Sequence, residues 1–109
     1  MSARLTTSGQ NDLLRATFLT GRVVITEGIL ALPDADRQEV ILKVRTYDDF
    51  HPDNDPNGER DFGSFDQNGV GKVFWKIDYY NPTLTGGSED PADPKRTTRV
   101  LTIMLAREY

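Results

Sequence analysis

The sequence predicts an α+β fold in which two helices pack on one face of an antiparallel sheet of three to four strands. The clearest observation is the strict alternation of residues 70–80, which places apolar side chains on one side of a strand. Residues 22–26 and 99–108 are rich in β-branched and aliphatic residues, as strands are. Two further segments repeat apolar residues at helical spacing, so the expected order of elements is α-β-α-β-β-β.

The chain is long enough for one domain. Its 109 residues, of which 37% are hydrophobic, provide a single modest core. We expect this domain to span residues 9–109, behind a disordered tail of residues 1–8.

The first helix is expected over residues 10–19. Leu14 and Phe18 lie four residues apart on one face, with Leu13 beside them. The β-branched residues 22–26 follow as the first strand.

The next apolar segment, residues 29–32, is either a paired strand or a buried connector. Asp34 then suits the start of a second helix, because a carboxylate is favoured at the positive end of the helix dipole. Val40 and Val44 lie on one face of this helix, which therefore packs on the rest of the domain. Pro52 disfavours helical geometry in the residue before it, so the helix should end a few residues earlier.

A hairpin and a final strand complete the fold. Asn68-Gly69 is the preferred pair for a type I′ hairpin turn. In the strand that follows, Val73, Trp75 and Ile77 face the core. The final strand, residues 99–108, is apolar on both sides and suits an interior position in the sheet.

Composition excludes several classes of site. The chain has no cysteine, so a disulfide framework, a cysteine-ligated zinc and a thiol nucleophile are excluded. A net charge of −4 argues against nucleic-acid binding, which needs clustered Lys and Arg. No apolar run approaches the ~20 residues that span a bilayer, and the first residues lack the apolar core of a secretory signal. We expect a cytoplasmic protein without a membrane segment, whose partner is a protein.

The most unusual stretch is residues 47–63, YDDFHPDNDPNGERDFG, which we call the acidic loop. It carries six acidic residues and one arginine, a net charge of −5 within a chain of net charge −4. Such crowding of like charges requires solvent, a cation, a basic partner or internal hydrogen bonds. The acidic residues are Asp48, Asp49, Asp53, Asp55, Glu59 and Asp61.

A calcium-type pattern lies inside the acidic loop. Asp53, Asp55 and Asn57, followed by a glycine, match the first half of D-x-[DN]-x-[DN]-G, in which alternate oxygens point inward. Asp61 stands at the ninth position, but the twelfth, where a Glu completes the shell, is Ser64. Such hard oxygen ligands favour calcium or magnesium. The alternative is a connector whose carboxylates accept backbone hydrogen bonds.

The only histidine, His51, also lies in the acidic loop. With Asp48, Asp49 or Asp53 it would form an acid–base pair, because a carboxylate can orient an imidazole for proton transfer. The alternative is a solvated histidine in a turn.

A second candidate surface is the 81–96 connector, which is rich in Gly, Pro and acidic residues. Its Asp90 and Asp93 each precede a proline, and such steps fix the direction of the chain. Arg99 is a candidate partner for Asp90, Asp93 or an acid of the acidic loop. That ion pair would tie the two loops together, and we expect all three residues to contribute to binding.

Several stretches carry a resemblance to a known family. They read NDLLRATF, GRVVITEGILALP, YDDFHPDNDPNGERDFG, VFWKIDYY and SEDPADPKRTTRVLTIMLAREY. From Asn11 to Tyr109 the chain resembles a family of small alphaproteobacterial proteins known only as a domain of unknown function. The resemblance implies a bacterial, cytosolic, single-domain protein and brings no catalytic residues, so function has to be argued from the site.

The simplest interpretation is a non-enzymatic binding or regulatory protein that uses the acidic loop, with the 81–96 connector, against a basic partner. Charge complementarity would make such association fast and salt-sensitive. The alternatives are a domain stabilised by calcium or magnesium at residues 53–58, and a hydrolase-type enzyme that uses His51 with loop carboxylates.

Overall fold

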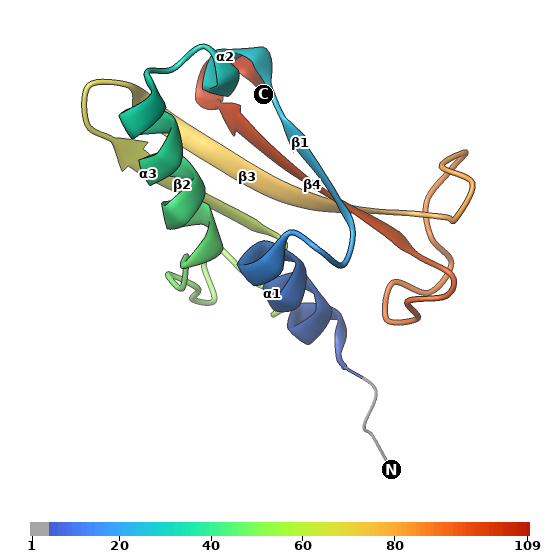
Figure 1. Cartoon of the computed structure of the whole chain (residues 1–109). Coiled ribbons are helices and arrows are strands. Elements are labelled where there is room, and N and C mark those ends of the chain that lie inside the picture. Colours follow the sequence, from blue (N-terminus) through green and yellow to red (C-terminus); the bar gives the residue numbers. More distant parts are fainter. Residues whose placement is uncertain (1–4) are drawn as a thin grey trace.

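The computed structural model describes residues 5–109 and confirms the α+β class (Figure 1). Four strands form one sheet in the order β1-β4-β3-β2. Their bounds are β1 Arg22–Ile25, β2 Phe62–Gln67, β3 Gly71–Tyr80 and β4 Thr98–Leu105. The helices are α1 Thr7–Thr17, α2 Glu27–Leu30 and α3 Asp34–Arg45, and a 3-10 turn, Ala106–Glu108, follows β4.

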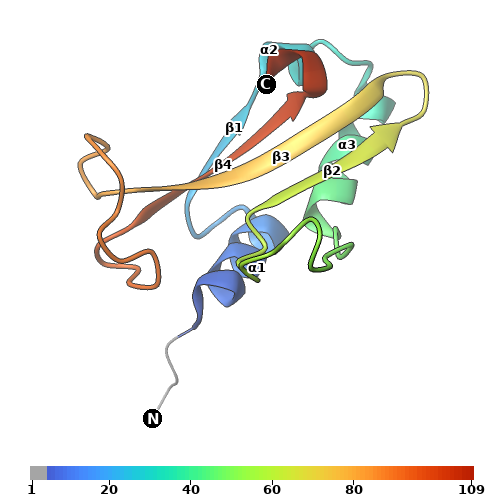
Figure 2. The same ribbon diagram turned by 180° about the vertical axis from the view of Figure 1, so that it is seen from behind.

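Helices α1 and α3 cover one face of the sheet, and the view from behind shows the other face without a helix (Figures 1 and 2). The short α2 was not expected as a helix, and it lies in the segment whose structure the sequence left open. Helix α1 begins at Thr7, inside the segment 1–8 that the sequence assigned to a tail. Residues 1–4 lie outside the described residues.

The sheet is mixed, which corrects the prediction of an antiparallel sheet. Strand β1 pairs with β4 in parallel, whereas the β2–β3 and β3–β4 pairs are antiparallel. It follows that β1 and β2 run in the same direction. The cause is α3, which returns the chain so that β2 starts at the same end of the sheet as β1. The antiparallel pair β3 and β4 then fills the space between them.

The β2–β3 turn also differs from the prediction in detail. A type I′ turn needs positive φ at both central residues, but the φ of Asn68 is not positive. Residues 68–70 form the connection instead, closed by a hydrogen bond of 3.0 Å from Val70 N to Gln67 O. Gly69 and Gly71 take positive φ values of 78° and 110°.

The core lies between the sheet and the two long helices. Val73, Trp75 and Ile77 are buried as predicted, and so are Val40 and Val44 of α3. Strand β4 is an interior strand, as expected, and it buries Leu101, Ile103 and Leu105.

Gly63 of β2 lies against the ring of Trp75, which leaves no room for a side chain at position 63. The two residues are paired across the β2–β3 ladder, and a Cβ on Gly63 would lie 2.4 Å from Trp75 Nε1. We therefore expect Gly63→Ala to lower the free energy of unfolding by about 1–3 kcal/mol, because the buried ring has no room to move. Chemical denaturation measures the loss.

Gly86→Ala is the matched control for this prediction. The nearest atom to a Cβ at Gly86 is 3.9 Å away, so we expect a change within about 0.5 kcal/mol. Equal stabilities of the two variants would show that Trp75 tolerates a methyl group at Gly63.

Candidate functional site

The buried face of α1 is unusually polar. Asn11 and Arg15, four residues apart and therefore on one helix face, are 0% and 4% exposed. Leu14 is buried beside them, but Leu13, which the apolar pattern grouped with it, is 40% exposed. A buried polar side chain is costly unless it is hydrogen-bonded, so the partners of these two residues organise this part of the molecule.

Arg15 joins α1 to the end of α3 and the start of the acidic loop. Its Nη1 donates to the carbonyl oxygens of Val44 at 3.1 Å and Tyr47 at 2.6 Å. The guanidinium group also lies over the ring of Trp75, 4.8 Å from the centroid. A cation at the C-terminus of a helix is favoured by the helix dipole, so Arg15 stabilises α3 while it holds the loop.

Asp12 connects Arg15 to the acidic loop. One carboxylate oxygen pairs with Arg15 Nη2 at 2.9 Å and the other with Arg60 Nη1 at 3.0 Å. Arg60 is the only cation of the acidic loop, and its guanidinium also lies over the Phe50 ring, 5.1 Å from the centroid. The loop's own arginine is therefore engaged by a carboxylate from outside the loop.

Asn11 is bonded to three other parts of the fold. Its Nδ2 donates to the backbone oxygen of Glu59 at 3.0 Å and to the Tyr79 hydroxyl at 2.8 Å. Its Oδ1 accepts from Arg99 Nε at 2.9 Å. One buried amide thus links the acidic loop, β3 and β4.

The two loops lie on opposite sides of α1 (Figures 1 and 2). The predicted ion pair of Arg99 with an acid of either loop is not among those formed within residues 5–109; Arg99 donates instead to two neutral groups, Asn11 Oδ1 of α1 and the carbonyl oxygen of Pro91. Gln10 adds a second link from α1, a hydrogen bond of 2.7 Å to the carbonyl oxygen of Ala92. The loops are therefore tied to one helix without forming one composite surface.

A polar groove separates α1 from the acidic loop. It has a volume of about 800 Å³ and is open to solvent. Asp12, Asp55 and Arg60 line it together with His51, so it presents both signs of charge.

The six acids of the acidic loop fall into two groups. Asp48, Asp49 and Asp53 are exposed, and their carboxylates make no hydrogen bond or ion pair with any residue of the described range 5–109. Asp55 accepts from the backbone N–H of Arg60 at 3.1 Å. Glu59 and Asp61 are partly buried and complete the second group.

Glu59 and Asp61 lie close enough to influence each other. Burial raises the pKa of Glu59 above its ordinary value of 4.5, and the charge of Asp61 and a hydrogen bond to Asp61 raise it further. Tyr79 acts in the opposite direction through a hydrogen bond. Burial in turn raises the pKa of the Tyr79 hydroxyl, which keeps it a hydrogen-bond donor.

The calcium-type pattern does not assemble as a cluster here. Within residues 5–109, no group of three or more His, Cys, Asp or Glu side chains is arranged to hold a metal ion. Asp55 accepts a hydrogen bond from the Arg60 N–H instead of joining Asp53 and Asn57.

His51 is exposed in the groove. Its backbone N–H donates to Asn54 Oδ1 at 2.9 Å, which shapes the turn. In the part of the chain that the structure describes, no hydrogen bond or ion pair joins its imidazole to Asp48, Asp49 or Asp53. The expected acid–base pair is therefore not formed.

Asp90 and Asp93 serve the internal structure of the 81–96 connector. Asp90 Oδ1 accepts from Ala92 N at 3.2 Å, and Asp93 Oδ1 accepts from Lys95 N at 3.0 Å. Both are Asx-type turns, in which the carboxylate replaces a backbone carbonyl.

The sequence did not identify Asn11, Asp12, Arg15 or Tyr79 as part of this site. One signal was present: polar Asn11 and Arg15 recur at helical spacing beside Leu14. A pattern of this kind ordinarily marks the solvent face of a helix. Only the structure shows that this face is buried.

The model of the family described as "Protein of unknown function (DUF3768)" matches residues 25–108, so the chain belongs to this family. No curated protein and no solved structure matches it. Between residues 5 and 109 there is no helix with the length and apolar character needed to cross a membrane.

Replacement of Asn11 by Ala should be strongly destabilising. It would leave a carbonyl oxygen, a hydroxyl and a guanidinium N–H without their partner in a buried region, so we expect a loss of about 2–4 kcal/mol in chemical denaturation. Asn57→Ala, at an exposed position of the acidic loop, should change stability by less than about 0.5 kcal/mol. Similar losses in both variants would contradict the role of Asn11.

Replacement of Glu59 by Gln should stabilise the protein at neutral pH. Because the folded-state pKa of Glu59 is raised, the folded protein binds more protons than the unfolded chain between pH 4.5 and that raised pKa, and its stability falls as pH rises through this window. The Gln variant lacks this loss. Its melting temperature should exceed that of the wild type at about pH 7 and approach it near about pH 4. A pH-independent difference would contradict the assignment.

Proposed function

We propose that this member of the DUF3768 family is a non-enzymatic binding module whose acidic loop binds a basic segment of a partner protein. The observation that carries the proposal is the set of three exposed carboxylates, Asp48, Asp49 and Asp53, which have no bonded partner within residues 5–109. Like charges held this close repel one another, and a cationic partner removes that repulsion.

The acidic loop is held in shape, which supports recognition. Asn54 Nδ2 donates to the carbonyl oxygen of Asp49 at 2.7 Å, and Asp55 N donates to the carbonyl oxygen of His51 at 2.8 Å. Arg15 fixes the start of the loop through Tyr47 O. A preorganised loop loses less conformational entropy on binding than a flexible one.

The loop's arginine does not neutralise these carboxylates. Arg60 is paired with Asp12 of α1, and Arg15 is buried against the same carboxylate. The side of the molecule that carries the acidic loop therefore keeps its negative charge. A basic peptide fits this field, whereas the phosphates of a nucleic acid would be repelled.

Fluorescence anisotropy with a labelled nona-arginine peptide tests the proposal. The triple variant Asp48→Asn, Asp49→Asn, Asp53→Asn should bind roughly tenfold more weakly than the wild type, since each exposed charge contributes on the order of 0.5 kcal/mol. Binding by the wild type should weaken between about 50 mM and about 300 mM salt, because salt screens exposed charges.

The matched control removes three exposed acids elsewhere: Glu27→Gln, Asp66→Asn, Glu89→Gln. It carries the same net charge as the loop variant and should bind within about twofold of the wild type. If the control loses as much affinity as the loop variant, binding reflects net charge alone and the proposed function fails.

A further inference from the structure

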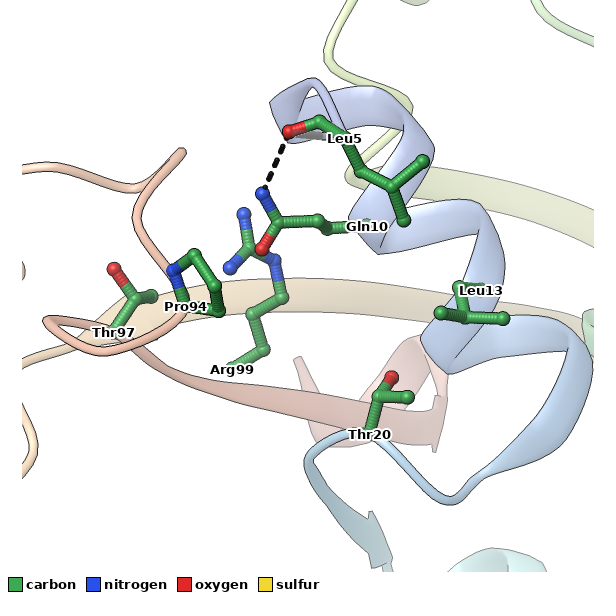
Figure 3. A pocket seen from close by; sticks show the side chains of 7 residues that line it. All are labelled: Leu5, Gln10, Leu13, Thr20, Pro94, Thr97 and Arg99. Atoms are coloured by element: carbon green, nitrogen blue, oxygen red, sulfur yellow. Dashed lines mark hydrogen bonds between the residues drawn. The ribbon is translucent and has the colours of Figure 1, made fainter. Parts of the chain in front are cut away.

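A second cavity lies on the other side of α1, between this helix and the 81–96 connector. Its volume is about 270 Å³. Most of its wall is apolar, but the buried Arg99 and the amide of Gln10 also face it (Figure 3). The lining residues are Leu5, Gln10, Leu13, Thr20, Pro94, Thr97 and Arg99.

Arg99 is a buried cation that has no bonded carboxylate among residues 5–109. It is 4% exposed, and it donates to Asn11 Oδ1 and to the carbonyl oxygen of Pro91. None of the ion pairs formed among residues 5–109 includes it. A buried charge is costly unless an opposite charge compensates it, so this position favours an anion.

The acidic groups near Arg99 do not supply that anion. Glu59 acts on Arg99 only as a charge beyond ion-pair distance. The Tyr79 ring lies 5.3 Å from the guanidinium carbon and contributes a cation–π contact. Asp90 and Asp93 direct an oxygen each to backbone N–H groups of the connector.

The cavity limits the size and the character of the anion. Its volume lies just below the usual range of about 300–1,000 Å³ for ligand sites, so the ligand is small. Leu5, Leu13 and Pro94 offer apolar contacts, and one guanidinium suits one planar carboxylate. A phosphate carries more charge than this single cation would neutralise.

We propose that this cavity binds a small organic acid, with its carboxylate on the Arg99 guanidinium and its apolar body against Leu5, Leu13 and Pro94. Gln10 Nε2 already donates to the carbonyl oxygens of Leu5 and Ala92, so Gln10 holds the wall of the site in place. The site is separate from the acidic loop, and it does not depend on the function proposed above.

NMR titrations with hexanoate and benzoate, compared with separate titrations with the neutral amides of the same acids, test this proposal. The acids should shift the backbone amide signals of Thr20, Thr97 and Arg99 in a saturable manner. Hexanamide and benzamide should bind at least about tenfold more weakly, because they lose the charge-assisted hydrogen bonds. Equal shifts by acids and amides, or no saturable shift by either acid, would overturn the proposal.

Two variants, one in the lining of the cavity and one outside it, separate binding from folding. Thr20→Trp fills the space without removing Arg99 and should abolish the shifts caused by hexanoate. Leu19→Trp, at a neighbouring side chain that is 84% exposed and outside the cavity lining, should leave them unchanged. If Thr20→Trp binds hexanoate as the wild type does, the acid binds elsewhere and the assignment is wrong.

Discussion

The arrangement of this domain depends on the polar face that α1 buries against the sheet. Asn11 and Arg15 bring an amide and a guanidinium group into a region that excludes water, and each must find several partners there. The partners are backbone carbonyls of the acidic loop and of α3, and polar side chains of β3 and β4. An apolar helix face would have held α1 on the sheet equally well, but it would not have positioned the loops.

This constraint explains why two loops far apart in the sequence depend on the same helix. The acidic loop is bound through Tyr47 O, Arg60 and the backbone oxygen of Glu59. The 81–96 connector is bound through the carbonyl oxygens of Pro91 and Ala92. Because α1 stands between them, one side of the helix carries uncompensated carboxylates and the other a buried cation beside a cavity. Each loop is held mainly through its backbone carbonyl oxygens, so side chains of the acidic loop remain available for contacts with a partner.

Local pattern was enough to predict the strands and the second long helix. Alternation placed Val73, Trp75 and Ile77 in the core, since a strand turns every second side chain to the same face. The parallel direction of β1 was not predictable in this way, because direction depends on where α3 returns the chain. The burial of Asn11 and Arg15 was not predictable either, because most of their partners, backbone carbonyls and side chains alike, lie 29 to 88 residues away. The acidic loop was recognised from composition, but which of its acids are bonded depends on tertiary contacts.

Comparison of Arg15 and Arg99, the two buried arginines of the described residues 5–109, shows what is unusual about the cavity. Arg15 has two carbonyl oxygens, aromatic rings and a carboxylate from Asp12, so its charge is compensated within the fold. Arg99 likewise contacts a carbonyl oxygen, an amide and the Tyr79 ring, but no carboxylate in the part of the chain that the structure describes is bonded to it. Burial lowers the pKa of both guanidinium groups, yet arginine keeps its proton at neutral pH, so the charge of Arg99 persists. The missing carboxylate coincides with a cavity open to a small acid, and this coincidence distinguishes a binding site from a packing defect.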